Sequence, residues 1–203
     1  WKEKNTAFVL GNTLIRRDAN GVVNEEEINL ASTVQRQGAE LYNRKGSAEE
    51  WSALTQILEK GHLHAHMFVL GVGLSAPLYN FTGLKGLTVS LYGPTGGGKT
   101  LAQYWAQSIY GNPDKLHFAA KYTQNSLFTR LGTYANLPLT IDEVTMMNDK
   151  EVGDFCYWVS QGRDKARLNR NAEERDAKTW ATPVIVSTNK SLQSKLIASG
   201  LDT

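Results

Sequence analysis

Hydrophobic residues follow two different patterns along the chain, and the change comes near residue 86. Before it, apolar positions recur every three to four residues, which is typical of amphipathic helices. After it, short continuous apolar runs alternate with helical stretches. The sequence therefore predicts a mainly helical region with a short β start over residues 1–86, and an α/β core over residues 87–203.

Helix signals are clearest in the middle of the first region. Ser47 and Glu50 form a capping-box pattern at the start of a predicted helix, which ends near Gly61. Its apolar face consists of Trp51, Leu54, Ile57 and Leu58. Weaker helical patterns cover residues 24–30 and 33–44, and a further helix is predicted over residues 63–76.

The first region also contains a predicted hairpin at its start and a strongly apolar segment near its end. Residues 7–10 and 13–15 flank Gly11 and Asn12, which predicts a hairpin or a bent strand. Residues 67–78 are the most apolar stretch, but a bilayer span needs about 20 residues. They predict a buried helix, and the sequence indicates no membrane segment.

Strands and helices alternate in the second region. Strands are expected over residues 87–92, 115–119, 137–141 and 183–187, and helices over residues 99–110, 126–134 and 149–161. Strands that alternate with helices form a parallel sheet with helices on both faces. The predicted fold class is therefore α/β, of the P-loop type once the motifs below are included.

Composition places the chain among ordinary globular proteins. Hydrophobic residues make up 41% and charged residues 21%, and the net charge is +2. These values argue against a disordered or collagen-like chain. The single cysteine, Cys156, excludes an intrachain disulfide and fits a reducing compartment such as the cytoplasm. No signal-peptide pattern follows Trp1, and because the first residue is not Met we expect a fragment.

A glycine-rich loop between a strand and a helix is the most specific motif. It reads Gly93-Pro94-Thr95-Gly96-Gly97-Gly98-Lys99-Thr100, which matches the Walker A pattern GxxxxGK[ST]. Glycines let backbone N–H groups surround a phosphate, and the following helix, which continues with Leu101, directs its positive end at the anion. We expect Lys99 to reach the β- and γ-phosphates of ATP, and the Thr100 hydroxyl to bind Mg²⁺.

Two acids end the strand over residues 137–141. Asp142 and Glu143 follow a buried apolar run, as in a Walker B motif. We expect Asp142 to hold Mg²⁺, usually through water. Glu143 is expected to orient and polarise the attacking water, which favours hydrolysis of a nucleoside triphosphate over binding alone. The alternative interpretation is a pair of capping residues that begins the next helix.

A third apolar strand also ends in polar side chains. Residues 184–186 lead to Ser187, Thr188 and Asn189. In P-loop enzymes that hydrolyse their nucleotide, a strand between the Walker A and Walker B strands brings a polar tip to the γ-phosphate. Asn189 fits this sensor position, with Thr188 as second choice. An ordinary asparagine at a strand-to-turn junction is the alternative.

These three elements in this order resemble the AAA+ and superfamily 3 helicase class. The match is closest to a bacteriophage and prophage family of ATPases, described as a domain of unknown function in phage primase–helicase proteins. The segments that carry the resemblance are residues 8–11, 46–51, 76–78, 93–100, 136–143, 161–168 and 187–192. It implies a DNA-replication ATPase that uses ATP and Mg²⁺ and works as a ring helicase. A homo-hexamer is expected for the full-length protein, and the expected location is the cytoplasm of a bacterial host.

The resemblance also gives a role to a basic segment between the Walker B and sensor strands. Helicases of this class place a DNA-gripping loop or hairpin there, and a few positive charges suffice to hold the phosphates of single-stranded DNA. The basic residues of this segment are Arg163, Lys165, Arg167 and Arg170. We prefer Lys165 and Arg167 as contacts, and a solvated loop is the alternative.

The resemblance further implies parts that the sequence does not supply. A ring ATPase needs an arginine finger, a last strand and a small lid, and we expect these beyond Thr203. Arg130 and Arg163 are weaker candidates for the finger within the chain.

Three rival functions stay open: an ATPase that loads or remodels a protein, a small-molecule kinase, and a nucleotide-dependent switch without turnover. His62, His64 and His66 lack the further ligands of a zinc site.

Overall fold

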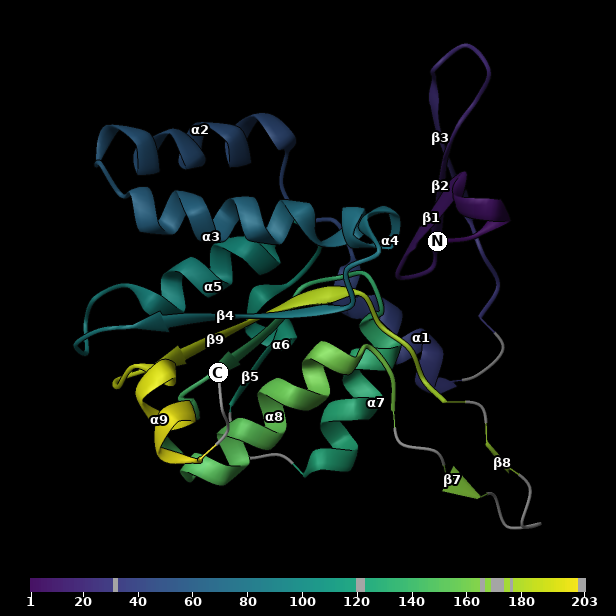
Figure 1. The fold of residues 1–203 in the computed structure, drawn as a ribbon. Helices are drawn as coiled ribbons and strands as arrows, with labels where there is room; N and C mark the ends of the chain where they lie inside the picture. Colours follow the sequence, from purple (N-terminus) through teal and green to yellow (C-terminus); the bar gives the residue numbers. More distant parts are fainter. Residues whose placement is uncertain (31–32, 120–122, 165–166, 169–173, 176, 201–203) are drawn as a thin grey trace.

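A four-stranded parallel sheet forms the centre of the computed structural model (Figure 1). The structure describes residues 1–30, 33–119, 123–164, 167–168, 174–175 and 177–200. The strand order is β4-β9-β6-β5, with bounds Gly86–Tyr92, Thr182–Thr188, Leu139–Asp142 and His117–Ala119. All three neighbouring pairs are parallel. The predicted α/β class is confirmed, and β9 lies between β4 and β6 as the sensor interpretation requires.

Helices cover both faces of this sheet (Figure 1). On one face α2, α3 and α5 are stacked in that order, with bounds Ala48–Lys60, His64–Ser75 and Lys99–Ser108. The opposite face carries α7, α8 and α9, with bounds Gln124–Tyr134, Asp149–Gln161 and Leu192–Ala198. The predicted helix over residues 149–161 therefore has the same bounds as α8.

The core follows the alternation of side chains along the central strand. Val184 and Val186 of β9 face the cluster formed with α7, α8 and β6, whereas Ile185 packs with Val69 of α3 and with Ala106 of α5. Successive side chains of a strand point to opposite faces, so one buried strand serves both clusters. Cys156 and Trp180 also belong to the larger cluster, as packing residues.

A second sheet forms at the start of the chain. Strands β1 (Ala7–Leu10), β2 (Thr13–Arg17) and β3 (Val23–Glu27) are antiparallel in the order β1-β2-β3. The predicted hairpin around Gly11 is confirmed, but the helix predicted over residues 24–30 is wrong, because β3 occupies its first half. Every residue of β3 is exposed, so no apolar face supported a helix there, and pairing with β2 satisfies its backbone instead.

Two other helices depart from their predicted form. Residues 33–44 form α1 (Thr33–Ala39) and a 3₁₀ turn (Glu40–Tyr42). A buried helix was expected for α3, but the helix is buried on one side only. Phe68 is 65% exposed, whereas Val69 is 1% exposed. The apolar residues of α3 lie on all sides, and only one side meets α5. The capping box at the start of α2 is present, with Ser47 and Glu50 each accepting the other's backbone N–H.

Short elements connect these layers. They are 3₁₀ turns over Glu3–Asn5, Ala76–Leu78 and Val144–Met146, the helices α4 (Tyr79–Thr82) and α6 (Pro113–Leu116), and the antiparallel pair β7 (Arg167–Leu168) and β8 (Glu174–Arg175). Within the described part of the chain, no helix has the length and apolar character that crossing a bilayer requires.

Candidate active site

The carboxyl ends of β4, β6 and β9 meet the first turn of α5, and the predicted chemistry gathers at this point. Lys99 begins α5, Asp142 ends β6 and Asn189 follows β9. In open parallel sheets, ligands bind outside the carboxyl ends of the strands. The fold therefore brings together residues from three separate stretches of sequence.

The glycine-rich loop runs from the end of β4 to the start of α5. Gly93, Gly96 and Gly98 have positive φ angles of 152°, 85° and 75°, a region that favours glycine. The first N–H groups of a helix have no partner within it, and at α5 they adjoin this loop. Thr95, Gly96, Gly97, Thr100 and Leu101 are exposed. The loop thus presents backbone donors to solvent at the positive end of a helix.

The ammonium of Lys99 is folded over this loop. Its Nζ donates to the carbonyl oxygens of Gly93 at 2.7 Å and of Pro94 at 2.9 Å. It also donates to Oδ1 of Asn189 at 3.2 Å. Lys99 is therefore held above the loop by neutral acceptors, which phosphate oxygens can replace with stronger charge-assisted bonds.

Asn189 links the lysine to the acidic strand end. Its Nδ2 donates to Oε1 of Glu143 at 3.3 Å, while its Oδ1 accepts from Lys99. Its backbone N–H donates to Oγ1 of Thr145 at 2.9 Å, which fixes the start of the turn after β9. Three residues that the sequence predicts as catalytic thus form one connected set. Thr188, the second choice, is buried and contacts Thr145 instead.

Glu143 adopts a left-handed backbone conformation, with φ 59° and ψ 48°. This conformation is uncommon outside glycine, and it persists only where the surroundings hold it. The backbone N–H of Glu143 donates to Oγ of Ser187 at 2.9 Å, and the side chain is exposed. The turn directs the Glu143 carboxylate toward Asn189.

Asp142 is contacted from both neighbouring strands. Ser187 of β9 donates its hydroxyl to Oδ1 of Asp142, and His117 of β5 places Nε2 3.5 Å from Oδ2. The Asp142 side chain is 34% exposed, so one side of the carboxylate is open to a ligand. A half-open carboxylate fits Mg²⁺, which keeps several waters and takes few protein ligands.

Sequence reasoning missed Ser187, His117 and Thr145. Ser187 stands at the polar end of β9, next to the predicted sensor positions Thr188 and Asn189. That signal could have found Ser187. No pattern in the sequence points to His117, because its role depends on the pairing of β5 with β6. Burial lowers the pKa of His117 below its ordinary value, and the charge of Asp142 opposes this shift.

The predicted basic residues are only partly described. Arg163 is exposed and pairs by its backbone with Thr179. Arg167 belongs to β7, and Lys165 and Arg170 lie outside the described residues. Arg130 places its guanidinium 3.5 Å from the ring centre of Phe118, so it packs against the sheet edge in this chain.

Three histidines, His62, His64 and His66, lie just before or at the start of α3. Among the residues that the structure describes, no group of three or more His, Cys, Asp or Glu side chains could hold a metal ion. His62 and His64 contact each other through their rings, and His66 lies beside the loop. A Cβ placed on Gly98 would come 2.5 Å from Nε2 of His66. The helix α3 therefore adjoins the loop directly.

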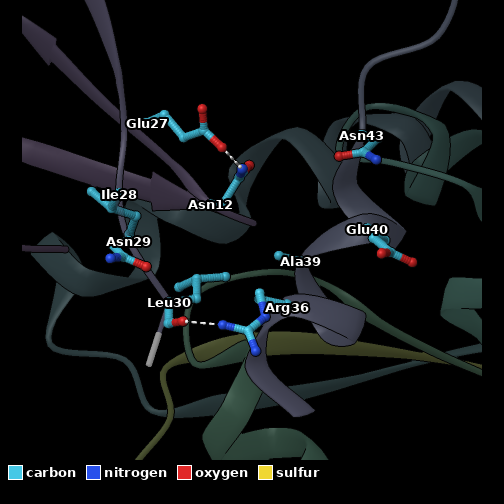
Figure 2. A pocket seen from close by; sticks show the side chains of 9 residues that line it. All are labelled: Asn12, Glu27, Ile28, Asn29, Leu30, Arg36, Ala39, Glu40 and Asn43. Carbon is cyan, nitrogen blue, oxygen red and sulfur yellow. Dashed lines mark hydrogen bonds between the residues drawn. The ribbon is translucent and has the colours of Figure 1, made fainter. Parts of the chain in front are cut away.

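A separate cavity of about 470 Å³ lies between the N-terminal sheet and α1 (Figure 2). In it Asn12 donates to Glu27 at 2.9 Å, and Arg36 donates to the carbonyl of Leu30 at 3.1 Å. None of its lining residues belongs to the predicted site. The cavity is therefore separate from the strand ends where Lys99, Asn189 and Glu143 meet.

The chain belongs to the family described as domain of unknown function DUF927, whose model matches residues 1–179. A solved structure titled "SCCmec type IV Cch - active helicase" has a similar fold, with a TM-score of 0.60 and 20% sequence identity. The match covers 90% of this chain and 35% of that chain. The present chain thus spans about a third of the solved structure. No curated protein matches the chain.

Proposed function

We propose that this chain is the ATP-hydrolysing part of a DNA helicase or translocase, of the AAA+ superfamily 3 type, in a phage or related replication protein. One observation carries the proposal: Lys99, Asn189 and Glu143 form a connected set at the carboxyl ends of the parallel strands. A cation, a polar amide and a carboxylate in this order suit a phosphate, its sensor and an attacking water.

The loop and the first turn of α5 are proposed to bind the triphosphate. Their backbone N–H groups and the Lys99 ammonium supply positive charge for the β- and γ-phosphates. Lys99 then exchanges the carbonyls of Gly93 and Pro94 for phosphate oxygens. Thr100 and Asp142 would hold Mg²⁺, which when bound neutralises charge on the phosphates.

Glu143 and Asn189 are proposed to act on the attacking water. The Glu143 carboxylate orients this water and accepts its proton. In this role it must lie within hydrogen-bond reach of the water. Asn189 contacts the γ-phosphate through its amide and reports its presence to Glu143, to which it is already bonded. Ser187 holds both the backbone of Glu143 and the side chain of Asp142 in place.

DNA is the proposed partner, gripped by the basic residues Arg163, Lys165, Arg167 and Arg170. Phosphate contacts need only positive charge at the right place, and a homo-hexameric ring would repeat these charges around its pore. The likeness in fold to a chain titled an active helicase supports this choice over the kinase and the switch. The proposed location is the cytoplasm of a bacterial host.

The test is the ATPase activity of the full-length protein with and without single-stranded DNA. We expect Mg²⁺-dependent hydrolysis that DNA stimulates and that Asp142→Asn abolishes. Hydrolysis that a protein partner stimulates and DNA does not would favour the loader or remodeller. Absence of any hydrolysis by the full-length protein, with and without DNA, would contradict the proposal.

A further inference from the structure

His117 reaches from the edge strand β5 into the site. In the pairing of β5 with β6, it stands opposite Thr140, and Asp142 lies two residues further along the same face. Its Nδ1 is 3.1 Å from Oγ1 of Thr140, and its Nε2 is 3.5 Å from Oδ2 of Asp142. The imidazole side chain is only 9% exposed. One buried ring therefore connects two positions of the neighbouring strand.

The groups on the two sides of the imidazole, Thr140 and Asp142, favour a proton on Nε2. Gln107 of α5 donates from Nε2 to Oγ1 of Thr140 at 3.2 Å, and to the carbonyl of Pro138 at 3.0 Å. The Thr140 hydroxyl accepts from Gln107 and has its own hydrogen to donate to Nδ1 of His117. Because the Asp142 carboxylate faces Nε2, the neutral imidazole carries its proton on that nitrogen. The opposite tautomer would set a lone pair against the carboxylate.

Asp142 is the group that Nε2 of His117 faces in this position. This nitrogen is buried, and no other hydrogen-bond partner meets it among the described residues. A buried polar atom without a partner costs free energy, so a ring needed only for packing would be better served by phenylalanine. Tyr104 already packs edge-on against the imidazole, with ring centres 5.0 Å apart. The imidazole nitrogens are therefore the feature to explain.

We propose that His117 is a positioning residue that aims Asp142 at the magnesium ion, an inference that rests on the proposed function of Asp142. Ser187 holds Oδ1 from β9, and His117 faces Oδ2 from β5. The carboxylate is thus fixed between two strands while its open side faces solvent. Contacts in apo proteins are often long and tighten when the ligand binds, which the 3.5 Å separation permits. Outer partners of metal ligands orient them in this way.

Three substitutions separate the two nitrogens of the ring. In His117→Gln the amide nitrogen can take the place of Nε2 and still donate to Asp142. In His117→Asn the shorter amide can replace Nδ1 alone, so Asp142 loses its donor from β5. His117→Phe keeps the ring and loses both nitrogens. A purely structural role of the ring would rank phenylalanine above glutamine, whereas positioning of Asp142 ranks glutamine first.

The measurement is the affinity for a slowly hydrolysed ATP analogue by calorimetry, over a series of Mg²⁺ concentrations and in excess chelator. We expect His117→Asn and His117→Phe to raise the half-saturating Mg²⁺ concentration by about 10- to 100-fold. Affinity in chelator should be unchanged, and His117→Gln should resemble wild type. Mn²⁺ binding followed by electron paramagnetic resonance gives a second readout that needs no turnover.

The outcomes separate this inference from the proposed function. If folded His117→Asn has the wild-type Mg²⁺ dependence while Asp142→Asn loses it, His117 has no positioning role and the proposed function stands. If Asp142→Asn itself keeps the wild-type dependence, the magnesium assignment fails and takes this inference with it. Should His117→Asn not fold, folded His117→Phe carries the same test, because it also removes the donor to Asp142.

Discussion

Asn189 accepts a hydrogen bond from Lys99 at 3.2 Å, although 90 residues separate them in the sequence. The oxygen of the amide faces the cation, and its nitrogen faces the Glu143 carboxylate at 3.3 Å. The two opposite charges thereby fix the orientation of a neutral side chain between them. A ligand that draws Lys99 away from the amide also frees its oxygen side, so Asn189 is placed to sense what Lys99 binds.

Asn189→Ala should leave nucleotide binding nearly intact and lower turnover by about 100-fold, the size expected when one transition-state donor is removed. Asn189→Asp is a sharper variant, because it keeps the acceptor for Lys99, loses the donor and sets a like charge beside Glu143. We expect it to bind nucleotide and to hydrolyse it slowly. Steady-state kinetics with calorimetry checks both, and wild-type turnover in Asn189→Ala would remove the residue from the mechanism.

Glu143→Gln should bind MgATP like wild type and lose turnover by about 10²- to 10⁴-fold, because an amide cannot accept the proton of water. Glu49→Gln is a matched control, because Glu49 is exposed and belongs to α2, which does not contribute to the predicted site. Phosphate release at saturating ATP gives the rate. Hydrolysis by Glu143→Gln at the rate of the control would show that another group activates the water.

Much of the fold follows from local patterns, whereas part of the site does not. The alternation of strands and helices predicts the parallel sheet, and the polar ends of two strands predict Asp142 and Asn189. Ser187 and His117 act across strand boundaries, so their contacts depend on register and strand order. The strand β3 is missed by local patterns for a related reason: its pairing with β2, and not its own sequence, determines its conformation.

Two glycines of α3 should respond oppositely to alanine. A Cβ on Gly73 would come 2.9 Å from Cβ of Ala106 on α5, whereas Gly71 has nothing within 4 Å. We expect Gly73→Ala to destabilise the fold by about 1–3 kcal/mol through overpacking. Gly71→Ala should stabilise it by about 0.5–1 kcal/mol, because alanine is the better helix former. Urea unfolding measures both, and equal effects would argue against close packing of α3 on α5.

Neutralising Lys165 and Arg167 together should weaken binding of single-stranded DNA by the full-length protein. The loss of affinity should be similar for all sequences, because phosphates carry no base information. The salt dependence should also flatten, by about 0.7 in log–log slope for each phosphate that the variant no longer neutralises. Removing two exposed charges elsewhere, Arg17 and Lys60, serves as the control. If the two double variants bind single-stranded DNA with the same affinity, the basic segment is only a solvated surface.

The loop from Gly93 to Thr100 is proposed to bind a nucleoside triphosphate through Lys99. Calorimetric titration of MgATP into wild type and Lys99→Ala measures this binding, with thermal unfolding to show that the variant is folded. We predict saturable one-site binding by wild type, and binding by Lys99→Ala that is abolished or steeply weakened, because the ammonium is the one side-chain charge held over the loop by its own carbonyls in the described structure. Equal affinity in the two folded proteins would contradict the claim.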